Sequence, residues 1–204
     1  MQNQDSYKTI KTLSEGLYKD RGSKFIALAW PVGSENEAKE RLAEAKKTYH
    51  DARHHCYAWV LGYQQENYRI NDDGEPSGTA GKPIYGQILS AGLTNILIIV
   101  VRYFGGTKLG VRGLIDAYRG AAKEAIDNGQ ILKKTIRSYY RLSFGYPAMN
   151  DVMRILKEHN LPQHDHNFQL SCTLDFSVRL SEAKSIEAQF GKLGNVTMEF
   201  LYSL

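Results

Sequence analysis

The sequence predicts an α+β protein of two domains, and its C-terminal third gives the clearest pattern. Apolar residues alternate strictly from Phe168 to Leu180, which is the period of a strand with one buried face. Shorter segments complete the pattern, with strands expected at residues 136–144, 161–164 and 196–202 and helices at 149–156 and 183–193. The chain is expected to turn at Asp165-His166-Asn167, and Ser181 to cap the second helix. The resulting order, βαββαβ, is the ferredoxin-like arrangement.

The first part of the chain mixes strands and helices around long glycine-rich loops. Strands are expected at residues 7–13, 24–32, 54–62, 67–70 and 96–101, and helices at 35–49, from about Pro83, and at 109–128. Ser34 precedes the first helix as a cap, and the run Ile96–Val101 has the composition of a buried central strand. The last helix is expected to bury one apolar face, which includes Val111 and Leu114. Because the pattern changes near residue 133, we place the domains at 1–133 and 134–204.

The bulk composition describes an ordinary globular protein and excludes some classes of function. The net charge of +4 permits a polyanionic partner but is weaker than that of dedicated nucleic-acid modules. The longest apolar run, Ile96–Val101, is far too short to cross a bilayer. The N-terminus lacks the features of a signal peptide, so a cytoplasmic location is expected. Cys56 and Cys172 are expected to be reduced thiols, and no metal or cofactor is expected.

Two glycine-rich loops flank the central strand, at Asn71–Pro83 and Arg102–Gly113. So much glycine costs backbone entropy, which suggests that the backbone approaches something closely. The second loop ends at a helix N-terminus, where free N–H groups and the helix dipole attract anions. Neither loop has the spacing of a P-loop, a dinucleotide-binding fingerprint or an EF-hand. An anion site outside these known motifs is therefore the prediction.

The candidate anion-binding residues come from both loops and from the strand before them. They are Arg53, His55, Ser77, Thr79, Lys82, Arg102, Gly105, Gly106, Thr107, Lys108 and Arg112. Other interpretations stay open: Ser77 and Thr79 could cap the following helix, and Asp116 could balance Arg112 on an ordinary solvated helix face. On a strand, His54 and Cys56 would share one face, and Cys56 is expected to be a small buried hydrophobe.

Three carboxylates, Asp72, Asp73 and Glu75, crowd the first loop. They are either parts of a solvent-exposed turn or acid/base groups next to the anion site. The sequence pairs no nucleophile, base and orienting group, so catalytic residues stay unassigned and a non-enzymatic protein is favoured.

Three segments together strongly resemble the Impact/YigZ family: Arg53-His54-x-Cys56, Asp72 to Gly81, and Val101 to Gly110. The resemblance covers most of residues 1–133, and the βαββαβ tail resembles the extra domain of the bacterial two-domain members. It implies a ribosomal protein S5 domain 2-like fold followed by a ferredoxin-like domain similar to late domains of elongation factor G. The chain departs from the family at Arg112-Gly113-Leu114, where Gly-Gly-Leu is typical, and at Asp116, where a basic residue is usual.

The eukaryotic Impact relatives are linked to control of translation initiation through a starvation kinase that bacteria lack, so that activity does not transfer. The leading hypothesis is a non-enzymatic protein that binds RNA or the ribosome through both loops and modulates translation. No DNA sequence specificity or membrane partner is expected, although a translation-associated protein could be a further partner. The rivals are a small-molecule enzyme, with Asp72, Asp73 or His55 as acid/base and a phosphorylated or carboxylated substrate, and a protein-binding adaptor.

Overall fold

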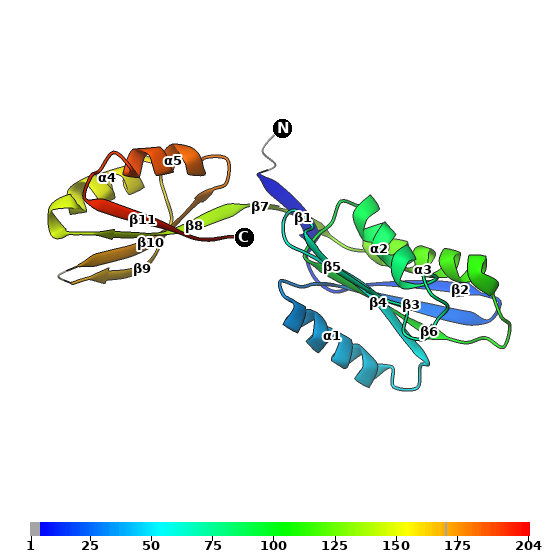
Figure 1. Cartoon of the computed structure of the whole chain (residues 1–204). Helices are drawn as coiled ribbons and strands as arrows, with labels where there is room; N and C mark the ends of the chain where they lie inside the picture. The colour runs from blue at the N-terminus through cyan, green and yellow to red at the C-terminus, as the bar shows by residue number, and fades with distance from the viewer. Residues whose placement is uncertain (1–4, 170) are drawn as a thin grey trace. The chain divides into compact units, whose positions relative to one another are not determined.

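The computed structural model describes residues 5–169 and 171–204, and they form two compact units (Figure 1). One unit is Tyr7–Lys134, and the other is Thr135–Leu204 together with Asp5 and Ser6. Both units combine an antiparallel sheet with helices, which confirms the α+β class. No helix in the described ranges is both long and apolar enough to cross a membrane.

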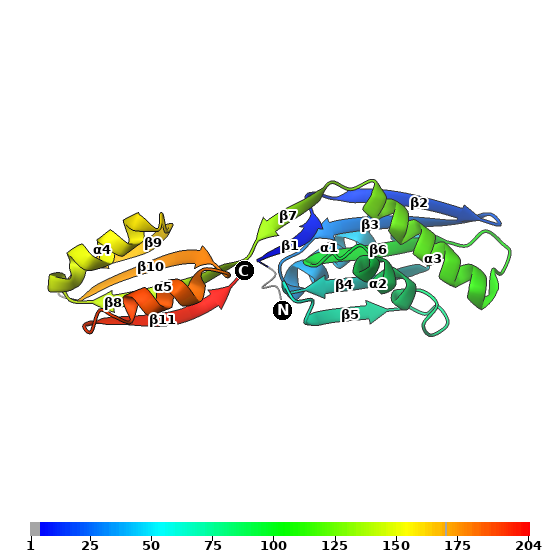
Figure 2. The same cartoon turned by 90° about the horizontal axis from the view of Figure 1, so that it is seen from above.

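The N-terminal unit is built on a five-stranded antiparallel sheet. Its strands in spatial order are β2 (Ser14–Asp20), β3 (Ser23–Pro31), β6 (Ile96–Tyr103), β4 (His54–Leu61) and β5 (Asn67–Asn71). A separate two-stranded sheet contains β1 (Ser6–Ile10) and β7 (Ile131–Thr135). Helix α1 (Glu35–Thr48) covers one face of the larger sheet, while α2 (Gly81–Ser90) and α3 (Gly110–Asp127) cover the other (Figure 2).

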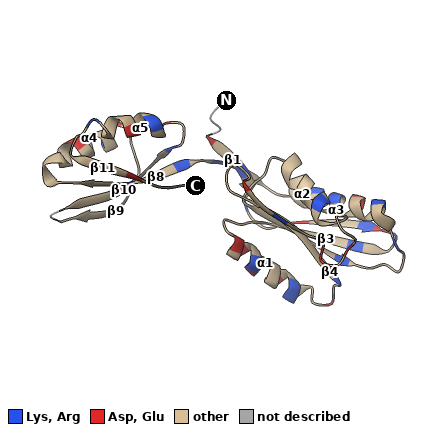
Figure 3. Ribbon diagram, in the orientation of Figure 1, with Lys and Arg blue, Asp and Glu red and all other residues tan. Residues whose placement is uncertain are grey.

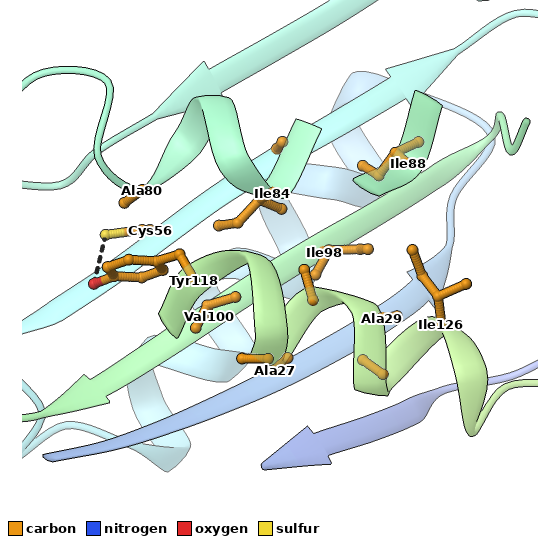
Figure 4. Close-up of a cluster of buried hydrophobic side chains, with 14 of the residues drawn as sticks. Ala27, Ala29, Cys56, Ala80, Ile84, Ile88, Ile98, Val100, Tyr118 and Ile126 are labelled. Carbon is orange, nitrogen blue, oxygen red and sulfur yellow. Dashed lines mark hydrogen bonds between the residues drawn. The ribbon is translucent and has the colours of Figure 1, made fainter. Parts of the chain in front are cut away.

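The central strand β6 is buried on both faces, as its composition predicts. Alternate side chains point to opposite sides of a strand, so Ile98 and Val100 pack with α2 and α3, whereas Leu97 and Ile99 pack on the α1 side. Figure 4 shows the α2/α3 side of this core. Helix α1 begins where the sequence places it, because the Ser34 Oγ accepts the Glu37 N–H at 3.2 Å.

Strand β2 is missing from the sequence-based prediction, which instead runs one strand over residues 7–13. The one fully buried residue of β2 is Gly16, and a side chain there would collide with the Ala125 backbone of α3. Because the helix comes so close, this position is occupied by glycine and not by the large apolar residue that usually marks the buried face of a strand. The expected burial of Val111 is also wrong: this side chain is 59% exposed at the beginning of α3.

The C-terminal unit has the order β8 (Arg137–Phe144), α4 (Met149–Glu158), β9 (Gln163–Phe168), β10 (Cys172–Arg179), α5 (Ala183–Phe190) and β11 (Val196–Ser203), with a 3-10 turn at Tyr146–Ala148. The strands are arranged β11-β8-β10-β9, and each pair is antiparallel. This is the predicted ferredoxin-like βαββαβ arrangement.

Two local predictions in this unit are wrong. Residues 165–167 belong to β9 and not to a turn, because His166 and Asn167 pair with β10 and Asp165, with φ of 24°, is the extra residue of a bulge. Strand β10 therefore begins at Cys172 and not at Phe168. Ser181 does not cap α5, since its backbone N–H and Oγ both donate to the Asp5 carboxylate and the N-cap residue is Glu182.

Candidate functional site

Asp72 organises the first glycine-rich loop. Its carboxylate accepts the backbone N–H groups of Gly78 (2.8 Å), Ala80 (3.0 Å) and Gly81 (2.8 Å). The N-cap residue of α2 is Ala80, which has no side-chain acceptor, so Asp72 satisfies the first N–H groups of this helix from a distance. This carboxylate therefore holds the loop backbone.

Asp73 fastens the same loop to strand β4. Its Oδ2 accepts the His55 backbone N–H at 2.6 Å, and its carbonyl oxygen lies 2.8 Å from the His54 Nδ1. A carbonyl can only accept, so Nδ1 of His54 carries the proton. The Asp73 carboxylate thus accepts a backbone hydrogen bond from strand β4, whereas the Asp72 carboxylate accepts backbone hydrogen bonds at the beginning of helix α2.

Glu75 is the third carboxylate, and it lies in a buried chain of hydrogen bonds. Its Oε1 accepts from Arg102 Nη1 at 2.5 Å and from the Tyr118 hydroxyl at 2.9 Å. The Tyr118 oxygen in turn lies 3.3 Å from Cys56 Sγ (Figure 4). The chain links the first loop to β6, α3 and β4, so it holds together the elements that surround the site.

Cys56 and Tyr118 are kept neutral by their surroundings. Burial raises the pKa of the Cys56 thiol, and the nearby carboxylates raise it further. Burial, with Cys56 and Glu75 beside it, also raises the pKa of Tyr118. Because the thiolate is the reactive form of cysteine, Cys56 is a buried small side chain here, as the sequence predicts, and not a nucleophile.

The guanidinium of Arg102 lies between two aromatic rings. Its Cζ is 5.4 Å from the ring centre of Phe25 and 5.7 Å from that of Phe104. Arg102 is only 7% exposed, and its Nε has no hydrogen-bond partner among the described residues. One edge of this buried cation is therefore paired with Glu75, whereas the Nε–H finds no acceptor in the described part of the chain.

The glycines of the second loop are explained largely by the folding of the loop itself. A side chain on Gly105 would overlap the backbone of Gly22 and Ser23, so the loop packs directly against the turn between β2 and β3. Gly106 and Gly110 have φ of +88° and +71°, which favour glycine, and a side chain at either would meet open space. The backbone approach expected from the sequence is thus in part an approach to the chain itself.

A pocket of about 480 Å³ joins the two loops on the α2/α3 side of the sheet. Its polar lining consists of Arg53, His54, Glu75, Arg102 and Lys108, and its other lining residues are Pro76, Phe104, Leu109, Gly110, Val111 and Leu114. Phe104 and Val111 are among the exposed large apolar side chains of the protein. The pocket thus places cations beside an apolar wall at the N-terminus of α3.

The predicted site residues divide into two groups. Arg53, Arg102 and Lys108 line the pocket together with Glu75. The other predicted residues do not line it: Thr79 is buried, with its hydroxyl donating to the Pro76 carbonyl at 2.6 Å, and the remaining ones are exposed, namely Ser77, Lys82, Gly105, Gly106, Thr107 and Arg112. The carboxylates of Asp72 and Asp73 are likewise absent from the lining.

His55 lies on the opposite side of β4 from the pocket. It is buried, and its Nε2 lies 3.1 Å from the Tyr49 carbonyl, next to the end of α1. Burial lowers the pKa of its imidazole. His54 lines the pocket in its place, and the sequence contains the necessary signal, because His54 shares the strand face of Cys56.

The comparisons with known proteins agree with this architecture. Residues 21–126 match the family described as the Impact N-terminal domain. The chain is 29% identical to the IMPACT family member YigZ of Escherichia coli (strain K12), over 88% of this chain and 89% of that protein. It is 35% identical to the IMPACT family member YvyE of Bacillus subtilis (strain 168), over 75% of this chain and 70% of that protein. The chain is also similar to a hypothetical protein of known crystal structure. The two sequences are 27% identical, and the structures match over 98% of each chain with a TM-score of 0.75.

Proposed function

Because the chain belongs to the Impact family, we propose that it is a non-enzymatic protein that binds RNA, free or in the ribosome, and modulates translation. The proposed contact surface is the rim of the pocket between the two glycine-rich loops. Cations on this rim would meet phosphates, and exposed apolar side chains would meet unpaired bases.

The observation that carries the proposal is the distribution of unpaired positive charge around the second loop. Lys and Arg recur along α3 (Figure 3), but its later cations are neutralised. Arg119 lies 3.0 Å from Asp116, and Lys123 pairs with Asp127. Asp116 therefore forms its ion pair with Arg119 and not with Arg112. Arg53, Lys108 and Arg112 are in no ion pair within the described ranges, and Arg53 and Lys108 line the pocket, so positive charge beside the second loop is left free for a ligand, although other surface cations of the unit are unpaired as well.

Phe104 supports binding of single-stranded in preference to double-stranded RNA. Its ring is 53% exposed, although it follows a strand that is buried almost throughout. An exposed aromatic ring next to cations is the usual arrangement for stacking an unpaired base while its phosphates are neutralised. A base inside a duplex offers no free face to such a ring.

A small-molecule enzyme is the second candidate, and the volume of the pocket favours it, since about 480 Å³ is in the range of ligand sites. The carboxylates that would act as acid/base groups argue against an enzyme. Asp72 and Asp73 hold backbone N–H groups, and Glu75 already accepts from Arg102 and Tyr118. General acid/base catalysis needs a group within reach of the substrate proton, and these three are engaged elsewhere. Binding without catalysis is therefore the better supported function.

The test is recovery of a tagged protein from lysate at low salt, with and without nuclease, combined with co-sedimentation with purified ribosomes. The wild type should co-sediment and recover RNA that nuclease removes. Arg53→Glu/Lys108→Glu should lose both, whereas Lys47→Glu, on the exposed side of α1, should behave as wild type. Recovery of the same protein partners after nuclease would favour an adaptor, and unchanged binding by the double variant would overturn the proposal.

A further inference from the structure

Helix α3 begins at the pocket, and no side chain of the described residues caps it. The first N–H groups of any helix lack internal partners and carry the positive end of the helix dipole. In this unit α1 is capped by Ser34, with Glu35 and Glu37 in its first turn, and Asp72 serves α2. The N-cap residue of α3 is Leu109, whose side chain makes no capping bond, and its first turn contains no acidic residue. Gly110 and Val111, in the first turn of α3, line the pocket, and their N–H groups have no acceptor among the residues that the structure describes.

Arg102 gives a second, independent indication of an anion. It lines the same pocket, it is only 7% exposed, and its Nε–H has no acceptor in the described part of the chain. A buried donor without a partner is costly, so the protein alone leaves this guanidinium incompletely satisfied, and a nearby anion would favour its charge. Glu75 also lines the pocket, but its Oε1 already accepts from Arg102 Nη1 and Tyr118. With Arg53 and Lys108, the lining has more positive than negative charge.

The apolar wall shows that a bare anion is not the whole ligand. Phe104 and Val111 are 53% and 59% exposed, and Pro76 and Leu109 continue the same lining. An inorganic phosphate would leave these surfaces in water, whereas a planar ring attached to the phosphate would cover them. The pocket volume of about 480 Å³ also exceeds what a phosphate alone requires.

We infer that the pocket holds one nucleotide unit, with its phosphate at the N-terminus of α3 and its base against Phe104. This inference rests on the proposed function, because it assigns a ligand to the same pocket. A free mononucleotide and an unpaired nucleotide of an RNA strand share this chemistry. Arg53 and Lys108 would neutralise the phosphate at the rim, and the charge of the Arg102 guanidinium, which lines the same pocket, would attract it further inside.

The inference is tested by following backbone amide signals of the ¹⁵N-labelled full chain by NMR. The probes are adenosine 5′-monophosphate, adenosine, inorganic phosphate and a short single-stranded oligoadenylate. The monophosphate or the oligomer should shift the amides of residues 104–112, and adenosine and phosphate should each bind at least about tenfold more weakly, since each lacks one half of the contacts. Phe104→Ala should weaken binding by about tenfold to a hundredfold.

Val111→Asp separates ligand binding from folding. Val111 is the second residue of α3, and an acidic residue there complements the helix dipole, so the melting temperature should be unchanged or higher. The same carboxylate would repel a phosphate and should weaken binding at least about tenfold. Asn36→Asp is the matched control, because Asn36 is the second residue of α1 and is exposed. It adds the same charge at the equivalent helix position outside the pocket.

The outcomes distinguish the two sources of the nucleotide. Shifts at residues 104–112 with the oligomer alone assign an RNA nucleotide, and shifts with the monophosphate alone assign a free nucleotide. The second result would support the inference while contradicting the proposed function. If neither probe shifts these amides, or if Val111→Asp binds as well as wild type, the inference is wrong. Recovery of RNA by the wild type that Arg53→Glu/Lys108→Glu abolishes would then still support the proposed function, because that test does not require a nucleotide inside the pocket.

Discussion

Arg102 and Glu75 form a buried ion pair, with Nη1 and Oε1 2.5 Å apart and neither side chain more than 8% exposed. The pair connects strand β6 to the first glycine-rich loop across 27 residues of sequence. It is the point at which the two loops, separated along the chain, become one site. The stability of this ion pair therefore determines how strongly the two loops are held together around the pocket.

Removing one partner of this pair should be costly. Arg102→Met leaves the Glu75 carboxylate buried without its cation, so the free energy of unfolding should fall by about 3–5 kcal/mol. Arg102→Met/Glu75→Gln removes both charges and keeps an acceptor for Tyr118, so it should cost less than the sum of the single changes. Urea unfolding followed by tryptophan fluorescence measures this, because Trp30 and Trp59 both lie in the N-terminal unit. Strictly additive losses would contradict the coupling.

Gly105 should tolerate no side chain, whereas Gly86 should benefit from one. Gly105→Ala would overlap the backbone of Gly22 and Ser23, and such overpacking typically costs about 1–3 kcal/mol. Gly86 lies within α2 with no atom near its missing side chain, so Gly86→Ala should stabilise the protein by about 0.5–1 kcal/mol. The same unfolding assay compares the two variants. Equal effects would show that the contact between the second loop and the β2–β3 turn is absent in solution.

His55 should make the stability of the N-terminal unit depend on pH. Burial lowers its pKa below the ordinary 6.5, so the unfolded chain binds this proton more readily than the folded chain. The contribution of neutral His55 is complete above pH 6.5 and is lost as the pH falls towards the folded-state pKa. His55→Gln keeps a donor for the Tyr49 carbonyl and should flatten the decline between about pH 7 and pH 5.

The control for this experiment is His50→Gln, which removes an exposed histidine of the same unit. Its unfolding free energy should follow the wild-type pH dependence. If His55→Gln and wild type lose stability in parallel as the pH falls, the proposed protonation of a buried His55 is wrong.

Cys56 should react with alkylating reagents only when the N-terminal unit opens. Its thiol is fully buried, and burial raises its pKa, so little thiolate forms at pH 8. In a Cys172→Ala background, alkylation of the folded chain should be at least about a thousandfold slower than in urea, as expected for a group exposed only by unfolding. Labelling of the native protein within a few-fold of the unfolded rate would place Cys56 among accessible, reactive thiols.

Regular periodicity made most elements predictable from the sequence. The strict alternation in the C-terminal third and the apolar run Ile96–Val101 correspond to real strands, because burial on one or both faces leaves a direct pattern in residue type. Strand β2 left no such pattern, since its one fully buried residue is Gly16, where the α3 backbone comes too close for a side chain. Asp165 led to the opposite error, a turn predicted where a strand continues. The residue type favoured in turns also suits the unusual backbone conformation of a β-bulge.

The site was less predictable than the fold for a related reason. Sequence spacing showed that both loops were unusual, but it could not show which carboxylates face a ligand. Asp72 and Asp73 bind backbone N–H groups, and only Glu75 lines the pocket. Val111 was expected in the core from helical periodicity, yet it lies in the first turn of α3, where the core has not begun. Such distinctions depend on tertiary contacts that a local pattern does not contain.

The most direct test of the account is RNA binding measured by fluorescence anisotropy across salt concentrations. If Arg53, Lys108 and Arg112 each neutralise a phosphate of a single-stranded RNA, the logarithm of the binding constant should fall against the logarithm of salt with a slope of about −2. Arg53→Glu/Lys108→Glu should bind much more weakly and with a shallower slope, while Lys47→Glu should match wild type. Binding by the double variant with the affinity and salt slope of wild type would contradict the central claim.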